Sequence, residues 1–409
     1  MAAIDRNIGR DYRQDPQRTT EELRESLDRG RSGQPGGLKP EEFSLRDLAE
    51  ELVLDRSGEQ CGREYLRAID PRQDSAGPVQ ESGAGVDTSA FNNITGQIVY
   101  SRVLQAYQNE AFVATGMVPT VPTRFDGEKI PGMTRVGDSN EIVQPGMPYP
   151  AQGFGEDYIE TPRTTKRGMI VPVTKEAVFF DRTGLILSRA GEVGEWMGVN
   201  KEKRILHAII DGDTAFRYKW KGTTYATYVS SSGHGAVNLK ASNELVDWTD
   251  VDNVEQLFAD ITDPATGEPI LIGGKTVLVC PAKKFAANRV FDAKEIRYGD
   301  TDSATGTQTI ANNPISGYTV KVSAQLYAQI QLVGDGSQST VAAATAKLYW
   351  YCGDFGKAFN YMENWPITVT QAPQNSEAEF NNDIVARFKV SERGTPATID
   401  PRYVVKSTG

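Results

Sequence analysis

The stretch from residue 124 to residue 172 constrains this chain more than any other part of its sequence. Glycine and proline interrupt it repeatedly, charges of both signs are spread along it, and it has no apolar run that could form a core. Its two ends, 123–130 and 158–173, have the pattern of extended segments. Compact domains rarely carry so long a loop unless it has a function or is disordered. We therefore predict a long hairpin that gains its stability from neighbouring subunits.

The first 85 residues differ in composition from the rest of the chain. They are rich in Arg, Glu, Asp and Gln and poor in aromatic residues. Short amphipathic helices are predicted from Thr19 and over 44–53, and linkers at 30–40 and 71–90. One interpretation is a partly disordered acidic tail. The other is a scaffolding-type extension that helps assembly and is later removed.

Two helices are predicted in the next part of the chain. The first covers 91–107, and its narrow apolar face is typical of an arm that packs on another body. The second covers 174–210 with a break at Gly184, and it contains Gly191, Gly194 and Gly198. Each of these three glycines costs about 1 kcal/mol relative to alanine inside a helix. We therefore expect close backbone packing at these positions.

The remaining sequence alternates between short strands and helices. Residues 214–248 have a loop-like composition with a strand signal at 225–229, and Thr249 or Asp250 caps a helix with a clean apolar stripe. A further helix is predicted at 282–291. Strands are predicted at 275–280, 318–323, 347–351, 367–370 and 382–390. The pattern indicates an α+β fold.

The residues that usually carry chemistry are scarce or badly placed. Three widely spaced cysteines, Cys61, Cys280 and Cys352, argue for a reducing compartment and against a disulfide framework or a zinc cluster. There are two histidines and no carboxylate pair that stands out from a solvated surface. The segment 273–276 ends like a phosphate-binding loop, but it lacks the first glycine and precedes its strand. We predict no catalytic residues, no cofactor and no metal site.

The net charge of −10 bears on nucleic acid. A protein that holds DNA by neutralising its phosphates usually has a basic face, so we expect DNA near this protein to be confined rather than gripped. No stretch of about 18 apolar residues occurs, so no membrane span is expected. The first 13 residues lack the apolar centre of a secretory signal.

The order of these elements resembles that of the major capsid proteins of tailed phages, which have the Hong Kong 97 capsid fold. An arm, FNNITGQIVYSRVLQAYQ, precedes the long hairpin, whose return strand leads through TTKRGMIVPVTKEAVFFDRTG to the long helix. In that segment Thr174, Glu176 and Asp181 match the family pattern. ADITDPATGEPI and KTVLVC resemble the axial domain. The ending, FNNDIVARFKVSERGTPATIDPRYVVK, is similar to capsid proteins of Mu-like and related phages.

The resemblance implies a fold with an N-terminal arm, an extended loop called the E-loop, a peripheral domain with a long spine helix, and an axial domain. The expected parts are a helical and linker extension at 1–85, the arm at 86–123, the E-loop at 124–173, the peripheral domain at 174–249 and 345–409, and the axial domain at 250–344.

The resemblance also implies a structural head protein, not an enzyme. Copies of the chain would form the hexamers and pentamers of an icosahedral shell that encloses double-stranded DNA without reading its sequence. Further partners would be a portal protein, a scaffold or a maturation protease. The protein would be located in the virion, assembled in the bacterial cytoplasm. Candidate contacts between subunits are Lys129, Arg135, Glu141, Lys166, Arg167, Phe91 and Tyr107.

One chemistry of the family is not expected here. In its founding member an E-loop lysine forms an isopeptide bond with an asparagine of a neighbour. Lys129 and Lys166 lie in or near the loop, and the asparagines of the last third are Asn360, Asn364, Asn381 and Asn382. None of these positions matches a motif, so we interpret the lysines as ordinary surface charges.

Three other classes of protein fit the sequence less well. An encapsulin-type nanocompartment has the same fold but encloses enzymes, and the long extension and long hairpin favour the viral shell. A secreted β-rich binding module would explain the aromatic region at 216–248, but it predicts a signal peptide. A hydrolase predicts an activated nucleophile, and none is visible.

Overall fold

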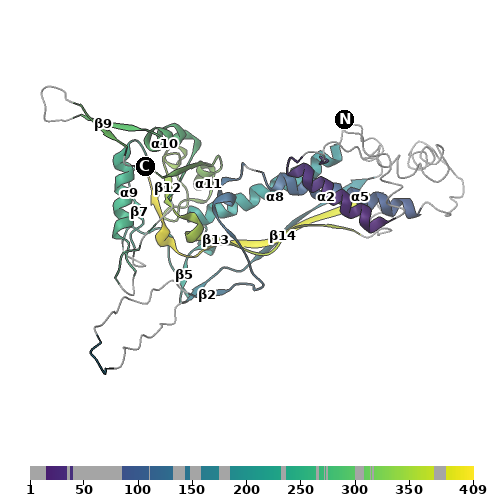
Figure 1. The fold of residues 1–409 in the computed structure, drawn as a ribbon, viewed down its shortest axis with the longest axis horizontal. Helices are drawn as coiled ribbons and strands as arrows, with labels where there is room; N and C mark the ends of the chain where they lie inside the picture. The colour runs from purple at the N-terminus through teal and green to yellow at the C-terminus, as the bar shows by residue number, and fades with distance from the viewer. Residues whose placement is uncertain are drawn as a thin grey trace. The chain divides into compact units, whose positions relative to one another are not determined.

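A computed structural model describes most of the chain and assigns its helices and strands (Figure 1). The described residues are 15–34, 37–39, 85–109, 111–131, 143–147, 158–174, 185–231, 236–263, 267–270, 272, 275–299, 308–313, 315, 317–372 and 384–409. Within them helices and β-sheets are mixed, which confirms the predicted α+β class. The predicted helix at 44–53 and most of the hairpin lie outside the described residues.

The chain divides into two compact units, each with its own apolar core. Unit 1 consists of Met1–Asn109, Lys166–Asn200 and Trp365–Arg393, and unit 2 of Glu110–Thr165, Lys201–Asn364 and Gly394–Gly409. Three long elements contribute residues to both units, namely α8 (Leu185–Ile209), β13 (Phe359–Gln371) and β14 (Ile384–Thr398).

Unit 1 is built from helices packed on the strands β4 (Thr165–Thr174), β13 and β14, which follow one another in the sheet order β1-β13-β14-β4. The helices are α2 (Pro16–Arg31), α5 (Gly85–Tyr107) and the first part of α8. Their apolar side chains meet those of the strands, such as Phe388 and Val390 of β14, in one buried core.

The start of α2 differs from the prediction. Asp15, not Thr19, is the N-cap, and its carboxylate accepts a hydrogen bond from the Arg18 backbone at 3.1 Å. Because the helix starts one turn earlier, Thr19 lies inside it and is buried with Leu23 and Leu27. The three buried residues recur every four positions, so α2 presents one stripe to the core of unit 1. The helix α5 also starts earlier than predicted, at Gly85.

Close packing of α8 on α5 confirms the expectation of backbone contact for Gly194, whereas Gly191 approaches only a side chain. A Cβ atom on Gly194 would lie 2.3 Å from the Val103 carbonyl oxygen, and one on Gly191 would lie 3.0 Å from Nε of Arg102. Only glycine allows the backbones of the two helices to approach this far. The segment of the predicted helix before Leu185 lies outside the described residues.

Unit 2 is built around a five-stranded mixed sheet with the order β11-β8-β12-β15-β7. The strands are β11 (Thr319–Val322), β8 (Thr276–Val279), β12 (Trp350–Gly353), β15 (Val404–Ser407) and β7 (Leu239–Lys240). The first three match predicted strands. The strand β15 was not predicted, although all four of its residues are buried. The C-terminal end of the chain therefore belongs to the interior of unit 2.

Helices α9 (Trp248–Asp260), α10 (Lys284–Phe291) and α11 (Leu326–Val333) contribute buried residues to the same core as this sheet. The cap of α9 is Asp247, two residues before the earliest predicted position, and Asp250 closes a capping box with it. Short helices complete the unit: α6 (Val113–Met117), α12 (Ala343–Ala346) and α13 (Phe355–Ala358).

Two further sheets of unit 2 are small. The strand β2 (Lys129–Pro131) pairs with β3 (Tyr158–Glu160), which confirms that the two ends of the 124–172 segment meet as a hairpin. β3 then pairs with β5 (Lys219–Trp220), which turns back into β6 (Thr223–Thr224). The strands β9 (Glu295–Gly299) and β10 (Gln308–Asn312), which were not predicted, pair only with each other among the described residues.

The part of β13 that belongs to unit 2 also pairs with a short strand of the same unit. β1 (Thr120–Pro122) pairs in parallel with β13, with Thr120 opposite Tyr361. The predicted strand at 225–229 is absent from these described residues. The backbone there is bound by the Asn238 side chain, which accepts a hydrogen bond from the Val229 amide and donates one to the Thr227 carbonyl, both at 2.8 Å.

Candidate subunit interface

The base of the long hairpin is held by charges. Glu160 on β3 forms ion pairs with Lys219 of β5 and with Lys129 of β2, the latter at 3.8 Å. The hydrogen bond from Lys219 is the main cause that lowers the pKa of Glu160 from its ordinary value. The Lys129 ammonium also lies 4.3 Å from the centre of the Tyr158 ring. The base of the hairpin is therefore fixed to the rest of unit 2, while two-thirds of the Lys129 side chain stays exposed.

Polar side chains tie the two ends of the hairpin together just below this point. Asp126 accepts hydrogen bonds from the backbone and the hydroxyl of Thr164, at 2.9 and 3.0 Å. Asn364 donates from its amide nitrogen to the carbonyl oxygens of Thr123 and Phe125, at 3.1 and 3.2 Å. A cavity of about 370 Å³ opens beside these contacts and is lined mainly by charged and hydroxyl side chains. The two ends of the hairpin are therefore held together by side-chain hydrogen bonds as well as by strand pairing.

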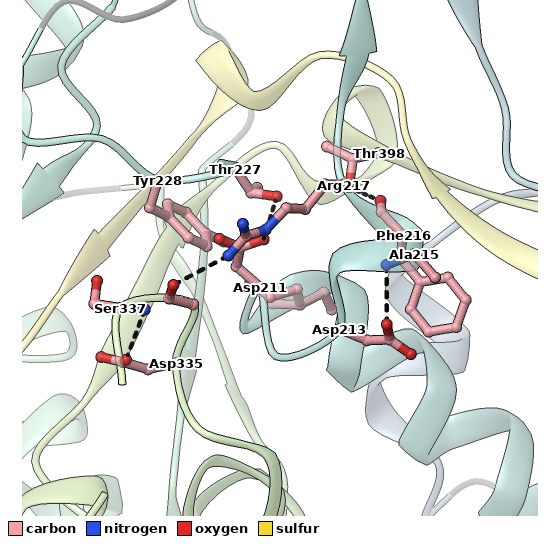
Figure 2. A network of polar contacts seen from close by, with 12 residues as sticks. Asp211, Asp213, Ala215, Phe216, Arg217, Thr227, Tyr228, Asp335, Ser337 and Thr398 are labelled. Atoms are coloured by element: carbon pink, nitrogen blue, oxygen red, sulfur yellow. Dashed lines mark hydrogen bonds and ion pairs between the residues drawn. The ribbon is translucent and has the colours of Figure 1, made fainter. Parts of the chain in front are cut away.

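Behind the base, a polar network surrounds the end of α8 (Figure 2). Asp211 adopts a positive φ of 61° where the helix ends. Its carboxylate accepts hydrogen bonds from Nε of Arg217 at 2.9 Å and from the Thr227 hydroxyl at 3.0 Å. Arg217 also donates to the Gly336 carbonyl at 3.1 Å. Burial raises the pKa of Asp211 above its ordinary value, against the opposing effect of Arg217.

The same network reaches the C-terminal strand. The ammonium of Lys406 is fully buried, lies 3.1 Å from a carboxylate oxygen of Asp335 and donates to the Asp335 carbonyl at 2.6 Å. The Tyr349 hydroxyl donates to the same carboxylate at 3.1 Å. Burial acts to raise the pKa of Asp335, but the charge and hydrogen bonds of its partners outweigh it and the pKa is lowered. Burial lowers the pKa of Lys406.

This network is a structural element rather than a reaction site. Its two carboxylates, Asp211 and Asp335, each face a cation, so its charges balance. Each of these two carboxylates accepts hydrogen bonds from donors of its own chain. Through Arg217 it joins the end of the long helix to the turn at 335–338 (Figure 2). Lys406 joins the same turn to β15.

Other potentially reactive side chains are buried or hydrogen-bonded within the chain. Cys280 and Cys352 are buried free thiols, and burial raises the pKa of Cys352. Nε2 of His207 lies 2.9 Å from the side-chain oxygen of Gln329. Within the described residues no group of three His, Cys, Asp or Glu side chains could hold a metal ion. Nor does any described helix have the length and apolar character needed to cross a membrane.

The structure distributes the predicted contact residues over both units. Lys129 lies at the hairpin base, and Lys166 and Arg167 are exposed on β4. Tyr107, at the end of α5, donates a hydrogen bond of 2.6 Å to Glu392 of its own chain. Phe91 falls within α5, and Arg135 and Glu141 lie outside the described residues.

Several exposed apolar residues were missed by the sequence analysis. Met169 and Ile170 are neighbours on β4 and are 49% and 63% exposed, and Trp196 on α8 is 62% exposed. Phe285 on α10 is the most exposed of the large apolar side chains among the described residues. A signal for Trp196 was present in the sequence. The apolar stripe predicted for its helix consists of Ile186, Ala190, Val193 and Met197, and Trp196 lies outside it.

Comparison with known proteins identifies the family. Residues 158–407, more than half of the chain, match the family model described as phage capsid protein. The chain therefore belongs to the phage capsid protein family, which confirms the class of structural protein predicted from the sequence. A search of curated proteins finds no match.

Solved structures similar to this chain include three capsids. The capsid of the native GTA particle is 12% identical with a TM-score of 0.45, covering 73% of this chain and 90% of that one. The bacteriophage PhiM1 mature capsid is 14% identical with a TM-score of 0.43, covering 72% and 86%. The capsid of the cyanophage P-SCSP1u is 10% identical with a TM-score of 0.44, covering 71% and 85%.

Proposed function

We propose that copies of this chain assemble into hexamers and pentamers of an icosahedral shell that encloses phage double-stranded DNA, with the Hong Kong 97 type of fold. Besides the family match, the proposal rests on the exposure of two adjacent apolar side chains on β4. Met169 and Ile170 follow one another and are both exposed. Because successive strand residues point to opposite faces, neither face of the strand is covered there. An apolar edge strand of this kind is a hazard unless another molecule covers it.

The arrangement of the small sheets supports the same proposal. A two-stranded sheet is at best marginally stable on its own, and β9 and β10 form such a pair. The hairpin at 124–172 is anchored through charges at its base. Contacts between different surfaces of adjacent copies can close into rings. Many modest contacts in one shell then give a stability that no single contact provides.

Negative-stain electron microscopy of the purified protein tests this proposal. We expect closed shells of uniform size built from rings of five and six subunits. A monodisperse monomer that persists at high protein concentration would refute it. The encapsulin alternative is separated by the content of the particles, because a phage head assembled during infection contains DNA whereas a nanocompartment contains protein cargo.

The N-terminal extension is proposed to act in assembly inside the shell, and to be removed by a protease near residues 75–90. The role in assembly is supported by α2, whose Leu23 and Leu27 are buried in the core of unit 1. The cleavage rests on the resemblance to phage capsid proteins alone. The extension thus docks on the same unit as the arm helix α5, which starts at Gly85. Intact-mass measurement on mature particles checks the proposal. A mature mass equal to that of the whole chain would contradict cleavage.

Partners and location follow from the same proposal. A portal protein, a scaffold and a maturation protease are proposed as further partners, with the virion as location after assembly in the bacterial cytoplasm. No enzymatic activity is proposed, because the buried charges of unit 2 are paired within the chain. Asp211 pairs with Arg217, and Asp335 pairs with Lys406. Co-purification from infected cells, followed by mass spectrometry, tests the list of partners.

Isopeptide crosslinks are not proposed. Asn364, the described asparagine nearest the hairpin base, donates its amide nitrogen to two carbonyl oxygens. Losing that nitrogen in a crosslink would break both hydrogen bonds. SDS electrophoresis of assembled particles should give a monomer band without a ladder of covalent multimers.

A further inference from the structure

At Val171, one face of β4 is covered by the core of unit 1, whereas the opposite face is exposed at the neighbouring residues. Val171 of β4 belongs to the buried core formed with the helices. Because side chains alternate along a strand, Lys166, Gly168 and Ile170 share the face opposite Val171. All three are exposed, and Ile170 is 63% exposed. This part of β4 therefore presents an apolar side chain and a lysine. Gly168 between them packs closely against β14, because a Cβ atom there would lie 2.5 Å from the Val390 carbonyl oxygen.

The neighbouring strand adds positive charge to that bare face. Phe388 and Val390 of β14 are fully buried in the core, and Lys389 between them is exposed. It therefore points to the same face as Ile170. Neither Lys166 nor Lys389 has an ion-pair partner among the described residues. We call Lys166, Gly168, Ile170 and Lys389 the β4 face.

A second bare surface of unit 1 has the opposite charge. Trp196 lies about 200° around the α8 helix from Gly194, the residue that contacts α5. It is therefore directed away from α5, and it is 62% exposed. Glu192 and Glu195 flank it and are exposed without an ion-pair partner in the described part of the chain. We call Glu192, Glu195 and Trp196 the Trp196 face.

The charges around the Trp196 face must be counted on both sides. Arg189 and Lys203 lie seven residues before and after Trp196 on α8, each about 10 Å along the axis at 1.5 Å per residue. The two glutamates lie within about one turn of the indole, so the negative charge is the nearer one. The face is aromatic and acidic, while the β4 face is apolar and basic.

The two faces are complementary, and both are exposed in the same chain. They therefore do not cover each other within one molecule. Tryptophan is enriched among the residues that dominate binding energy at protein interfaces. An indole packed on the exposed Ile170 side chain would also be within reach of the Lys166 ammonium. Glu192 and Glu195 would then face Lys166 and Lys389.

We propose that the Trp196 face of one copy of this chain binds the β4 face of a second copy. The proposal rests on the proposed function and names one of the contacts that build the shell. Because the two faces differ, the contact is head-to-tail, and it can repeat around a ring of five or six copies.

The test is a charge exchange measured by the critical concentration for shell assembly, using light scattering and electron microscopy of the full-length protein. One variant carries Glu192→Lys and Glu195→Lys, and another carries Lys166→Glu and Lys389→Glu. Each should raise the critical concentration by roughly tenfold or more, because like charges then face each other. A chain with all four changes should return to within about threefold of the original value.

A control separates local pairing from net charge. Combining Glu192→Lys and Glu195→Lys with Lys284→Glu and Lys294→Glu, two exposed lysines of unit 2, restores the net charge without restoring the pairing. This chain should not be rescued. Trp196→Ala alone should raise the critical concentration by about tenfold, with circular dichroism unchanged.

Two results would overturn the inference. One is a fourfold variant that assembles no better than either pair of changes. The other is a Trp196→Ala chain that assembles at the original concentration. In both cases normal shells of the unmodified chain would leave the proposed function standing. An unmodified chain that forms no shells would remove both.

Discussion

On the C-terminal strand, the ammonium of Lys406 is fully buried and depends on Asp335 for its only carboxylate partner within 4 Å in the described chain. Taking one member out of a buried ion pair leaves the other charge without compensation. A single substitution in this pair is therefore expected to destabilise the sheet of unit 2. Substitution of an exposed lysine in the same unit should have little effect on stability.

Replacing Lys406 with methionine should destabilise the full-length chain by about 3 kcal/mol, because the Asp335 carboxylate would then be buried without its cation. The measurement is urea unfolding at a concentration too low for assembly. The matched control is Lys321→Met on β11, where the lysine is exposed, and its effect should stay within about 0.5 kcal/mol. Equal effects of the two substitutions would show that the buried pair is not what stabilises β15.

The same pair predicts a dependence on pH. The pKa of Asp335 is lowered in the folded chain, so the unfolded state binds a proton more readily. The stabilisation is present above the ordinary aspartate pKa and is lost as the pH falls below about 4. The raised pKa of Asp211 has the opposite sign, because its protonation favours the folded state as the pH falls.

The free energy of unfolding should therefore fall more steeply below about pH 4 in the unmodified chain than in the Asp335→Asn variant, which lacks the titrating group. Urea unfolding of both chains at intervals between pH 6 and pH 3 checks this. The variant Asp211→Asn should change the slope in the other direction. Parallel curves for all three chains would mean that neither carboxylate titrates differently on folding.

At the scale of elements, the contact of α8 with α5 is fixed by glycine. A Cβ atom on Gly194 would lie 2.3 Å from the Val103 carbonyl oxygen. Gly194→Ala should therefore destabilise unit 1 by about 1–3 kcal/mol through overpacking, even though alanine favours a helix by about 1 kcal/mol. Gly116 in α6 is the control, since no atom would lie within 4 Å of its Cβ. Gly116→Ala should be neutral or stabilising in the same thermal unfolding experiment.

The sequence predicts those elements whose patterns are local. The long helix, the buried strand β8 and the hairpin base follow from spacing alone, and the packing role of Gly194 follows from the cost of glycine in a helix. The strand β15 was missed because Lys406 has the appearance of a solvent-facing residue. Its place in the core depends on Asp335, 71 residues earlier in the chain. Such a pairing cannot be seen in a local pattern.

The candidate interface was predicted in part for the same reason. Charged residues such as Lys166 attract attention in a sequence, and it is indeed exposed on β4. Ile170 and Trp196 are of residue types that are usually buried. Their exposure can be recognised only when it is known which residues pack on each strand and helix. An apolar residue outside the core stripe of its helix, as Trp196 is, remains the usable signal.

At the scale of the whole molecule, each unit has its own closed core, whereas the hairpin is attached to unit 2 through its base. Ion pairs and hydrogen bonds at Lys129, Asp126 and Glu160 hold this base. Pro131 and Tyr158 face each other in the register of β2 and β3. The segment between them can therefore be exchanged for a two-residue turn without disturbing the pairing.

Replacing residues 132–157 with Asn-Gly should leave folding intact and abolish shells. The cores of both units and the base contacts are retained, so the free energy of unfolding should change by less than about 1 kcal/mol. Assembly should fail because the proposed contacts of the hairpin with adjacent copies are gone. Thermal unfolding and electron microscopy on the same preparation give the two readouts. If shells of ordinary size still form, the hairpin is dispensable and the contacts that build the shell must lie on the units, where Trp196 and Ile170 are exposed.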